Sequence, residues 1–213
     1  LAPPRLSLPR NVDADAHARI DASAHAVAGP GLAGGDSFRL KLDAVPSQNR
    51  LLVDLKLDAP KGGLVDSYAA LGKPLMLSLD GHGDWANWHG ALIARAGALP
   101  LVDMALAGAN GHFQIKGQAM PNAVLAAGPA TRLTGPAIAL DGQAVLGQRR
   151  ADVHLNARSA ALAVQAQGLI NLANNSFGGF HIAAQLLTPG AIAPSASGRD
   201  VRLDAVLDGP FAT

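Results

Sequence analysis

The sequence lacks cysteine, so disulfide bonds and thiolate metal ligands are excluded. Charged residues make up only 15% of the chain, against about 25% in a typical soluble domain. The net charge of +1 gives no electrostatic reason to expect a nucleic-acid partner or an anionic membrane surface. No apolar run approaches the ~20 residues that a transmembrane helix needs.

Motifs that carry catalytic chemistry are also missing. The sequence has no G-x-S-x-G elbow, no P-loop and no H-E-x-x-H, so we expect no enzyme activity. Residues 29–34 match G-x-G-x-x-G by letter, but residues 36–44 alternate like a strand. A dinucleotide site needs a helix there, because the helix N-terminus holds the pyrophosphate. We therefore expect no cofactor.

The histidines do not form a metal-binding pattern. Residues 13–25 place three Asp and two His on one face of a predicted strand, spaced about 6.6 Å apart along it, which strains chelation by neighbours. His82 and His89 flank a Gly-rich turn, where a zinc site would need further ligands. We interpret both groups as solvated surface and expect no metal site.

Small and medium aliphatic side chains are abundant. Apolar residues are 49% of the chain, and counting glycine brings the share to roughly 60%, against about 45–50% for soluble domains. Residues 12–26 alternate strictly between apolar and polar, which predicts a strand with one dry face. Alanine favours helices, but the period of the pattern outweighs propensity in deciding the structure.

The same alternation recurs along the chain and predicts about twelve strands, joined mostly as antiparallel neighbours. Residues 64–71 predict the one short helix, with apolar side chains at i, i+4 and i+7 and a stop at Gly72. Residues 120–134 lack a clear period. They are a long connection within one continuous segment, 1–213, or a boundary between 1–119 and 135–213.

The apolar faces contain much alanine and few aromatic residues, so they would fill a closed core poorly. Such a surplus of apolar surface indicates a face that binds something. We therefore expect an all-β protein with a long curved antiparallel sheet that forms an open hydrophobic groove, although a sandwich or barrel also fits the strand pattern. The residues expected to line the groove are Phe38, Leu40, Leu42, Leu51, Val53, Leu55, Leu57, Leu75, Leu77 and Leu79.

Both tryptophans of the chain lie in one glycine-rich stretch, residues 81–90. An indole combines an apolar body with a polar N–H group, which suits the border of a hydrophobic face. We interpret the stretch as a tight strand connection whose indoles cover the edge of the apolar layer. Its characteristic positions are Gly81, Gly83, Trp85, Trp88 and Gly90.

Three passages, 51–63, 75–90 with its G-x-G-x-W-x-x-W-x-G pattern, and 201–213 ending in LDGPFAT, resemble the AsmA-like/TamB family of Gram-negative envelope proteins. The resemblance implies a protein anchored in the inner membrane that extends through the periplasm. It also implies a β-sheet trough that carries phospholipid acyl chains towards the outer membrane. TamB is further linked to outer-membrane protein assembly with a β-barrel partner, TamA. We expect the chain to be an internal segment of such a protein.

A second interpretation belongs to a different class. The chain would be a structural or adhesive β-solenoid or sandwich region of a secreted surface protein, with a closed core and no bound lipid. The two tryptophans and the helix predicted at 64–71 disfavour a regular solenoid.

Overall fold

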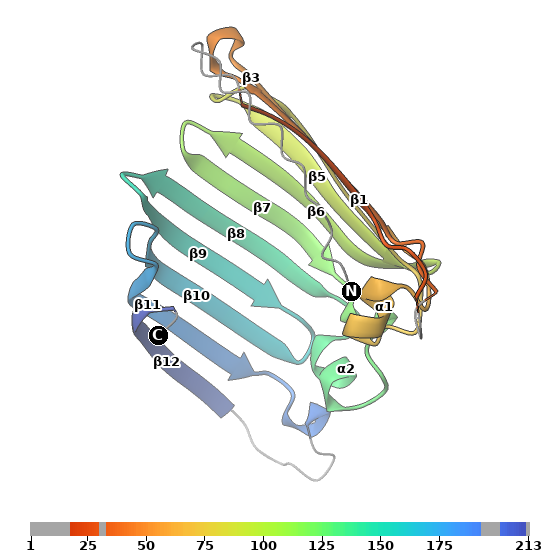
Figure 1. Ribbon diagram of the computed structural model, residues 1–213. Helices are drawn as coiled ribbons and strands as arrows, with labels where there is room; N and C mark the ends of the chain where they lie inside the picture. Colours follow the sequence, from red (N-terminus) through yellow and green to blue (C-terminus); the bar gives the residue numbers. More distant parts are fainter. Residues whose placement is uncertain (1–17, 30–32, 193–200, 212–213) are drawn as a thin grey trace. The chain divides into compact units, whose positions relative to one another are not determined.

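A computed structural model describes residues 18–29, 33–192 and 201–211 and confirms an all-β fold (Figure 1). Twelve strands follow one another in sequence order as neighbours in one antiparallel sheet, and the sheet is open because β1 and β12 do not pair with each other. The strands are β1 (Ala18–His25), β2 (Ser37–Val45), β3 (Arg50–Ala59), β4 (Leu75–Gly83), β5 (Trp88–Ala96), β6 (Leu99–Ala109), β7 (His112–Ala119), β8 (Ile138–Gly147), β9 (Arg150–Arg158), β10 (Leu162–Asn171), β11 (Ser176–Leu186) and β12 (Val201–Pro210).

The described strands carry the alternating pattern that predicted them. β1 covers the second half of the ribbon predicted at 12–26, and residues 12–17 lie outside the described part of the chain. Three single turns of 3-10 helix lie in the connections, at Pro46–Gln48, Pro121–Ala123 and Pro189–Ala191.

The predicted helix is confirmed as α1 (Leu64–Ala69), which ends two residues earlier than expected. It stops because Ala70 adopts the left-handed conformation, with φ of 51°, and so cannot continue the helix. Two glycines before and after the helix, Gly62 and Gly72, also have positive φ, which allows the chain to turn sharply on both sides.

The prediction of a single helix is wrong, because the described residues contain a second one, α2 (Pro129–Thr134). Six residues are too few to show a helical period, which is why the sequence indicated only an irregular connection there. Side chains stabilise it instead. The Gly128 N–H donates to Thr131 Oγ1 (2.7 Å), and Arg132 Nε donates to the Ala191 carbonyl oxygen (2.8 Å), a contact that depends on the tertiary fold.

The chain divides into two compact units, residues 1–106 and residues 107–213, and the division falls within β6. The subdivision expected at 120–134 falls instead on the connection between β7 and β8, and it stays a prediction. Each of the two helices lies in a connection between two strands of its own unit: α1 joins β3 to β4, and α2 joins β7 to β8.

Burial in the described residues is shallow. Ten of the fourteen buried apolar residues are alanine, and no large side chain is fully buried. Large apolar side chains remain exposed along the strands, for example Leu203 at 63% and Val206 at 59%. Such a layer does not form the thick core of a closed domain, where large aliphatic and aromatic residues dominate.

Both helices of the described chain have six residues, so neither is long enough to cross a bilayer.

Candidate functional site: one apolar sheet face and a polar hollow behind it

The residues predicted to line a groove come together on one face of the first unit. In an antiparallel pair, directly opposite residues project to the same side of the sheet. Leu55 of β3 lies opposite Leu40 of β2 on one side and Leu79 of β4 on the other. Leu57 similarly joins Phe38 to Leu77.

The other predicted lining residues follow the same register. Leu42 pairs with Val53, and Leu51 and Leu75 lie opposite the buried alanines Ala44 and Ala59. All ten predicted residues are half-buried, and they lie beside one another across the strands. The structure therefore places them on one apolar face, and their role as the lining of a groove stays a prediction.

The apolar face extends to both neighbouring strands. β1 contributes Ile20 opposite Leu42, and β5 contributes Leu92 opposite Leu79. These two positions were not among the predicted lining residues, although the alternating pattern of their strands includes them.

The second unit has an apolar face built in the same way. One cross-strand row runs through Leu140, Ala157, Val164, Ala184 and Leu203, from β8 to β12. None of these residues was predicted as lining, because the long leucine-rich strands of the first unit carried the stronger pattern.

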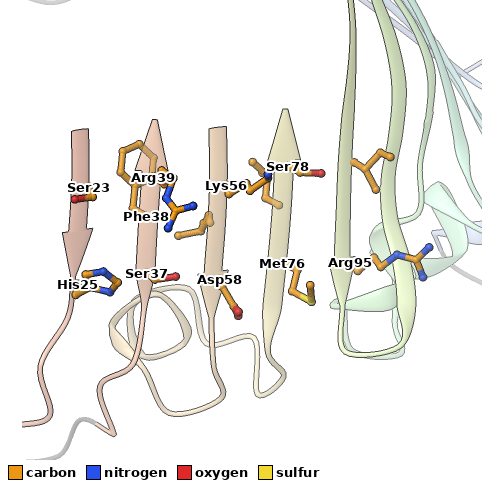
Figure 2. Close-up of a pocket in the computed structure, with 13 residues that line it drawn as sticks. Ser23, His25, Ser37, Phe38, Arg39, Lys56, Asp58, Met76, Ser78 and Arg95 are labelled. Carbon is orange, nitrogen blue, oxygen red and sulfur yellow. The ribbon is translucent and has the colours of Figure 1, made fainter. Parts of the chain in front are cut away.

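The opposite face of β1–β5 is charged and contains a hollow of about 420 Å³, which we call the polar hollow (Figure 2). Phe38, Leu57 and Leu77 also line it, between the two charged rows, although their side chains belong to the apolar face. Its sides are two rows of cross-strand partners. The first row is His25, Ser37, Asp58, Met76 and Arg95; the second is Ser23, Arg39, Lys56, Ser78 and Ile93.

A second hollow of about 330 Å³ lies further along the same charged face. Acids and bases alternate around it: Arg50 donates to Asp43 (2.7 Å), and Lys41 lies opposite both Asp21 and Asp54. Its lining holds four aspartates, Asp21, Asp43, Asp54 and Asp80, against Arg19 and Lys41, so this second hollow does not favour an anion.

The tryptophan stretch forms the connection between β4 and β5, as its interpretation as a tight turn predicted. Asp84 Oδ1 accepts the N–H groups of Ala86 (2.8 Å) and Asn87 (2.6 Å) and so closes the turn. Trp85 is exposed at the turn, whereas Trp88 lies back over the sheet.

Glycine is required at the three glycine positions of this stretch for two different structural reasons. A side chain at Gly81 or Gly90 would collide with the indole of Trp88. Gly83 has φ of 138°, a conformation that other residues rarely adopt, and its neighbour in space is the Asn87 carbonyl oxygen. Packing against Trp88 thus explains Gly81 and Gly90, and backbone conformation explains Gly83.

Two buried carboxylates hold the segment around α1. Asp36 accepts the N–H groups of Leu64 (2.6 Å) and Val65 (3.1 Å), which are two of the free donors at the helix start. Asp66 accepts those of Gly62 (2.7 Å) and Gly72 (2.6 Å). The Gly62 bond is the main reason that the pKa of Asp66 lies below its ordinary value. Both acids thus have structural partners.

The histidines expected to be solvated surface lie on the charged face. His82 and His89 are direct cross-strand partners, and His82 Nδ1 is 3.8 Å from Asp80 Oδ1. Within the described residues, no three His, Asp or Glu side chains are grouped so that they could hold a metal ion. His17, Asp13 and Asp15 lie outside the described residues.

No family model matches this chain, and searches of curated proteins and of solved structures return no match.

Proposed function

We propose that this chain is a segment of a periplasmic protein that conducts phospholipids between the inner and the outer membrane. Its apolar sheet face would carry the acyl chains. The observation behind the proposal is the register, which gathers Leu40, Leu55 and Leu79 with their neighbours into one apolar surface on consecutive strands. The sequence resemblance to AsmA-like/TamB proteins supports the same function.

The energetics of acyl-chain binding suit such a surface. Each CH₂ group removed from water contributes about 0.8 kcal/mol, whatever the detailed chemistry of the apolar partner. A broad face of leucine, valine and alanine is therefore sufficient, and no catalytic or ligand-specific residue is needed. The half-buried state of the ten predicted residues leaves part of each side chain free for a lipid.

The proposal includes the context that the resemblance implies. The complete protein would be anchored in the inner membrane, and it would meet an outer-membrane β-barrel partner of the TamA kind. A contribution to outer-membrane protein assembly belongs to the same proposal, because an apolar sheet face is also suited to contact β-strands of membrane proteins.

The test compares two neighbouring leucines of β3 that project to opposite faces. Leu55 lies in the centre of the apolar face, and Leu52 lies on the charged face, where it is 40% exposed. Chain 1–213 is purified from bacterial membranes in mild detergent, and bound phospholipid is measured by native mass spectrometry and lipid extraction. We expect Leu55→Asp to reduce bound phospholipid at least tenfold, because a carboxylate is poorly solvated among acyl chains.

Leu52→Asp is the matched control, since it introduces the same charge three residues away in the same strand. Both variants must keep the β-type circular dichroism of the parent chain. Equal lipid content in Leu55→Asp and the parent would show that this face does not bind the lipid. A lipid-free parent chain with one cooperative unfolding transition would favour the structural or adhesive protein instead.

A further inference from the structure

The polar hollow lies behind the proposed acyl-chain face, on the opposite side of the same strands. Arg39 is the direct cross-strand partner of Lys56 at its centre. Two like charges directly opposite each other destabilise a sheet. An anion bound between or above the two charges would remove this repulsion.

The charges around this pair do not neutralise it. Lys56 Nζ is 3.5 Å from Asp54 Oδ1, but Arg39 and Arg95 form no ion pair within the described residues. The only acid of the hollow is Asp58, in the first row. Arg39, Lys56 and Arg95 therefore line a space of about 420 Å³ with Asp58 as the one carboxylate of the lining, and Asp54 lies beside Lys56 outside it.

The uncharged residues of the polar hollow specify the anion further. Ser23 and Ser78 occupy the positions on either side of the Arg39–Lys56 pair in the second row, and Ser37 lies in the first row. Hydroxyl and guanidinium donors together match the several oxygens of a phosphate group better than they match a single-oxygen acceptor.

Two apolar side chains lie beside Arg95 at the β4–β5 end of the polar hollow. Met76 and Ile93 project from β4 and β5 on the charged face, with exposures of 54% and 42%. A ligand with its anionic group at Arg39 and an apolar group at its other end would place that apolar group against Met76 and Ile93. Neighbouring strands lie about 4.8 Å apart, so the two ends are within reach of one small molecule.

The geometry points to the polar hollow as a binding site for an organic phosphate: a phosphate ester held by Arg39 and Lys56, with its organic part against Met76 and Ile93. The hollow is within the volume range of small-molecule sites, about 300–1,000 Å³. The site goes beyond lipid conduction, because it is on the other face of the sheet. The phosphate comes from a soluble ester or from a lipid headgroup, which share the same chemistry.

In the test, chain 1–213 is titrated with inorganic phosphate and with butyl phosphate at constant ionic strength. Calorimetry measures the binding affinity, and amide NMR shifts locate the bound ligand. We expect saturable binding with shifts concentrated at 37–39 and 56–58, and at least threefold tighter binding of butyl phosphate than of inorganic phosphate. The double variant Arg39→Ser/Lys56→Ser should weaken butyl phosphate binding at least tenfold. Met76→Ser should remove the preference for butyl phosphate.

The control is Lys116→Ser/Arg158→Ser, which removes the same two charges from exposed strand positions of the second unit. It should bind butyl phosphate like the parent chain. Flotation with phosphatidylcholine vesicles that contain phosphatidylglycerol separates the two sources. Flotation that is lost in Arg39→Ser/Lys56→Ser assigns the site to a lipid headgroup, and butyl phosphate binding without flotation assigns it to a soluble ester.

Three results would overturn the inference: no saturable binding of butyl phosphate by the parent chain, unchanged binding in Arg39→Ser/Lys56→Ser, or an equal loss in the control. Leu55→Asp should retain full butyl phosphate binding, because Leu55 is on the other face. The organic-phosphate site and the proposed lipid conduction can therefore fail independently of each other.

Discussion

The indole ring of Trp88 on β5 occupies the space directly above Gly81 on β4, where a side chain would otherwise project. Gly90, the cross-strand partner of Gly81, leaves the same space open from the other strand. The ring can occupy this space only because both positions lack a Cβ atom. The motif that suggested an envelope protein family is therefore also a packing requirement of this hairpin.

Gly81→Ala should destabilise the protein, because the new methyl group and the indole cannot occupy the same space. Overpacking of this kind costs typically about 1–3 kcal/mol. Urea denaturation followed by circular dichroism measures the change. Adding Trp88→Leu to Gly81→Ala should recover part of the loss, so that the two substitutions are not additive.

Gly147→Ala provides the control for this prediction, since nothing lies within 4 Å of the position of its Cβ atom. Its effect should stay within about 0.5 kcal/mol. A Gly81→Ala variant as stable as the Gly147→Ala variant would mean that the indole moves aside freely.

Asp36→Ala should destabilise α1 and its connection to the sheet. The carboxylate accepts two of the free N–H groups at the helix start, those of Leu64 and Val65, from a position 28 residues before Leu64 in the chain. Loss of a helix cap costs about 0.5–2 kcal/mol. Hydrogen exchange of the amides of Leu64 and Val65 should accelerate accordingly. Asp103→Ala, an exposed site in β6, is the comparison; an equal effect there would argue against capping.

The bonds to Asp66 predict a pH dependence. Its pKa is lower in the folded chain than in the unfolded chain, chiefly because Gly62 donates to the carboxylate. Asp66 therefore contributes stability above the unfolded pKa of about 3.9, and this contribution falls as the pH drops towards the folded value. Asp66→Asn should be less stable than the parent at neutral pH, with the difference shrinking in acid. A difference that does not change between pH 7 and pH 3 would contradict this linkage.

Arg132→Lys should loosen the contact between α2 and the turn at Pro189–Ala191. The guanidinium donates to the carbonyl oxygens of Ala191 (2.8 Å) and Ile192 (3.3 Å), and a lysine ammonium cannot reproduce this fork. We expect a loss of about 1 kcal/mol in the free energy of unfolding. Arg158→Lys, at an exposed strand position, should change the stability little, and equal losses for both would exclude the contact as the cause.

The candidate site was predictable in part. The co-facial position of Leu40, Leu55 and Leu79 follows from alternation alone, because every second residue of a strand projects to the same side. The polar hollow was missed, although its signal was present: a hairpin that turns at 46–49 places Arg39 opposite Lys56. The pattern of one strand does not contain that information, since it depends on the pairing of two.

The amino-acid sequence by itself determined the all-β class, the twelve strands, the helix at α1 and the apolar side of each strand. The strands and their apolar sides follow from a local period of two residues, and α1 follows from its apolar spacing of i, i+4 and i+7 with a stop at Gly72. Only the tertiary structure decided the position of Trp88 above Gly81, the cap from Asp36, the helix α2 and the rows of the polar hollow. Each of these joins residues from separate elements, and the register between neighbouring strands, set by the turns and by packing, determines which side chains meet.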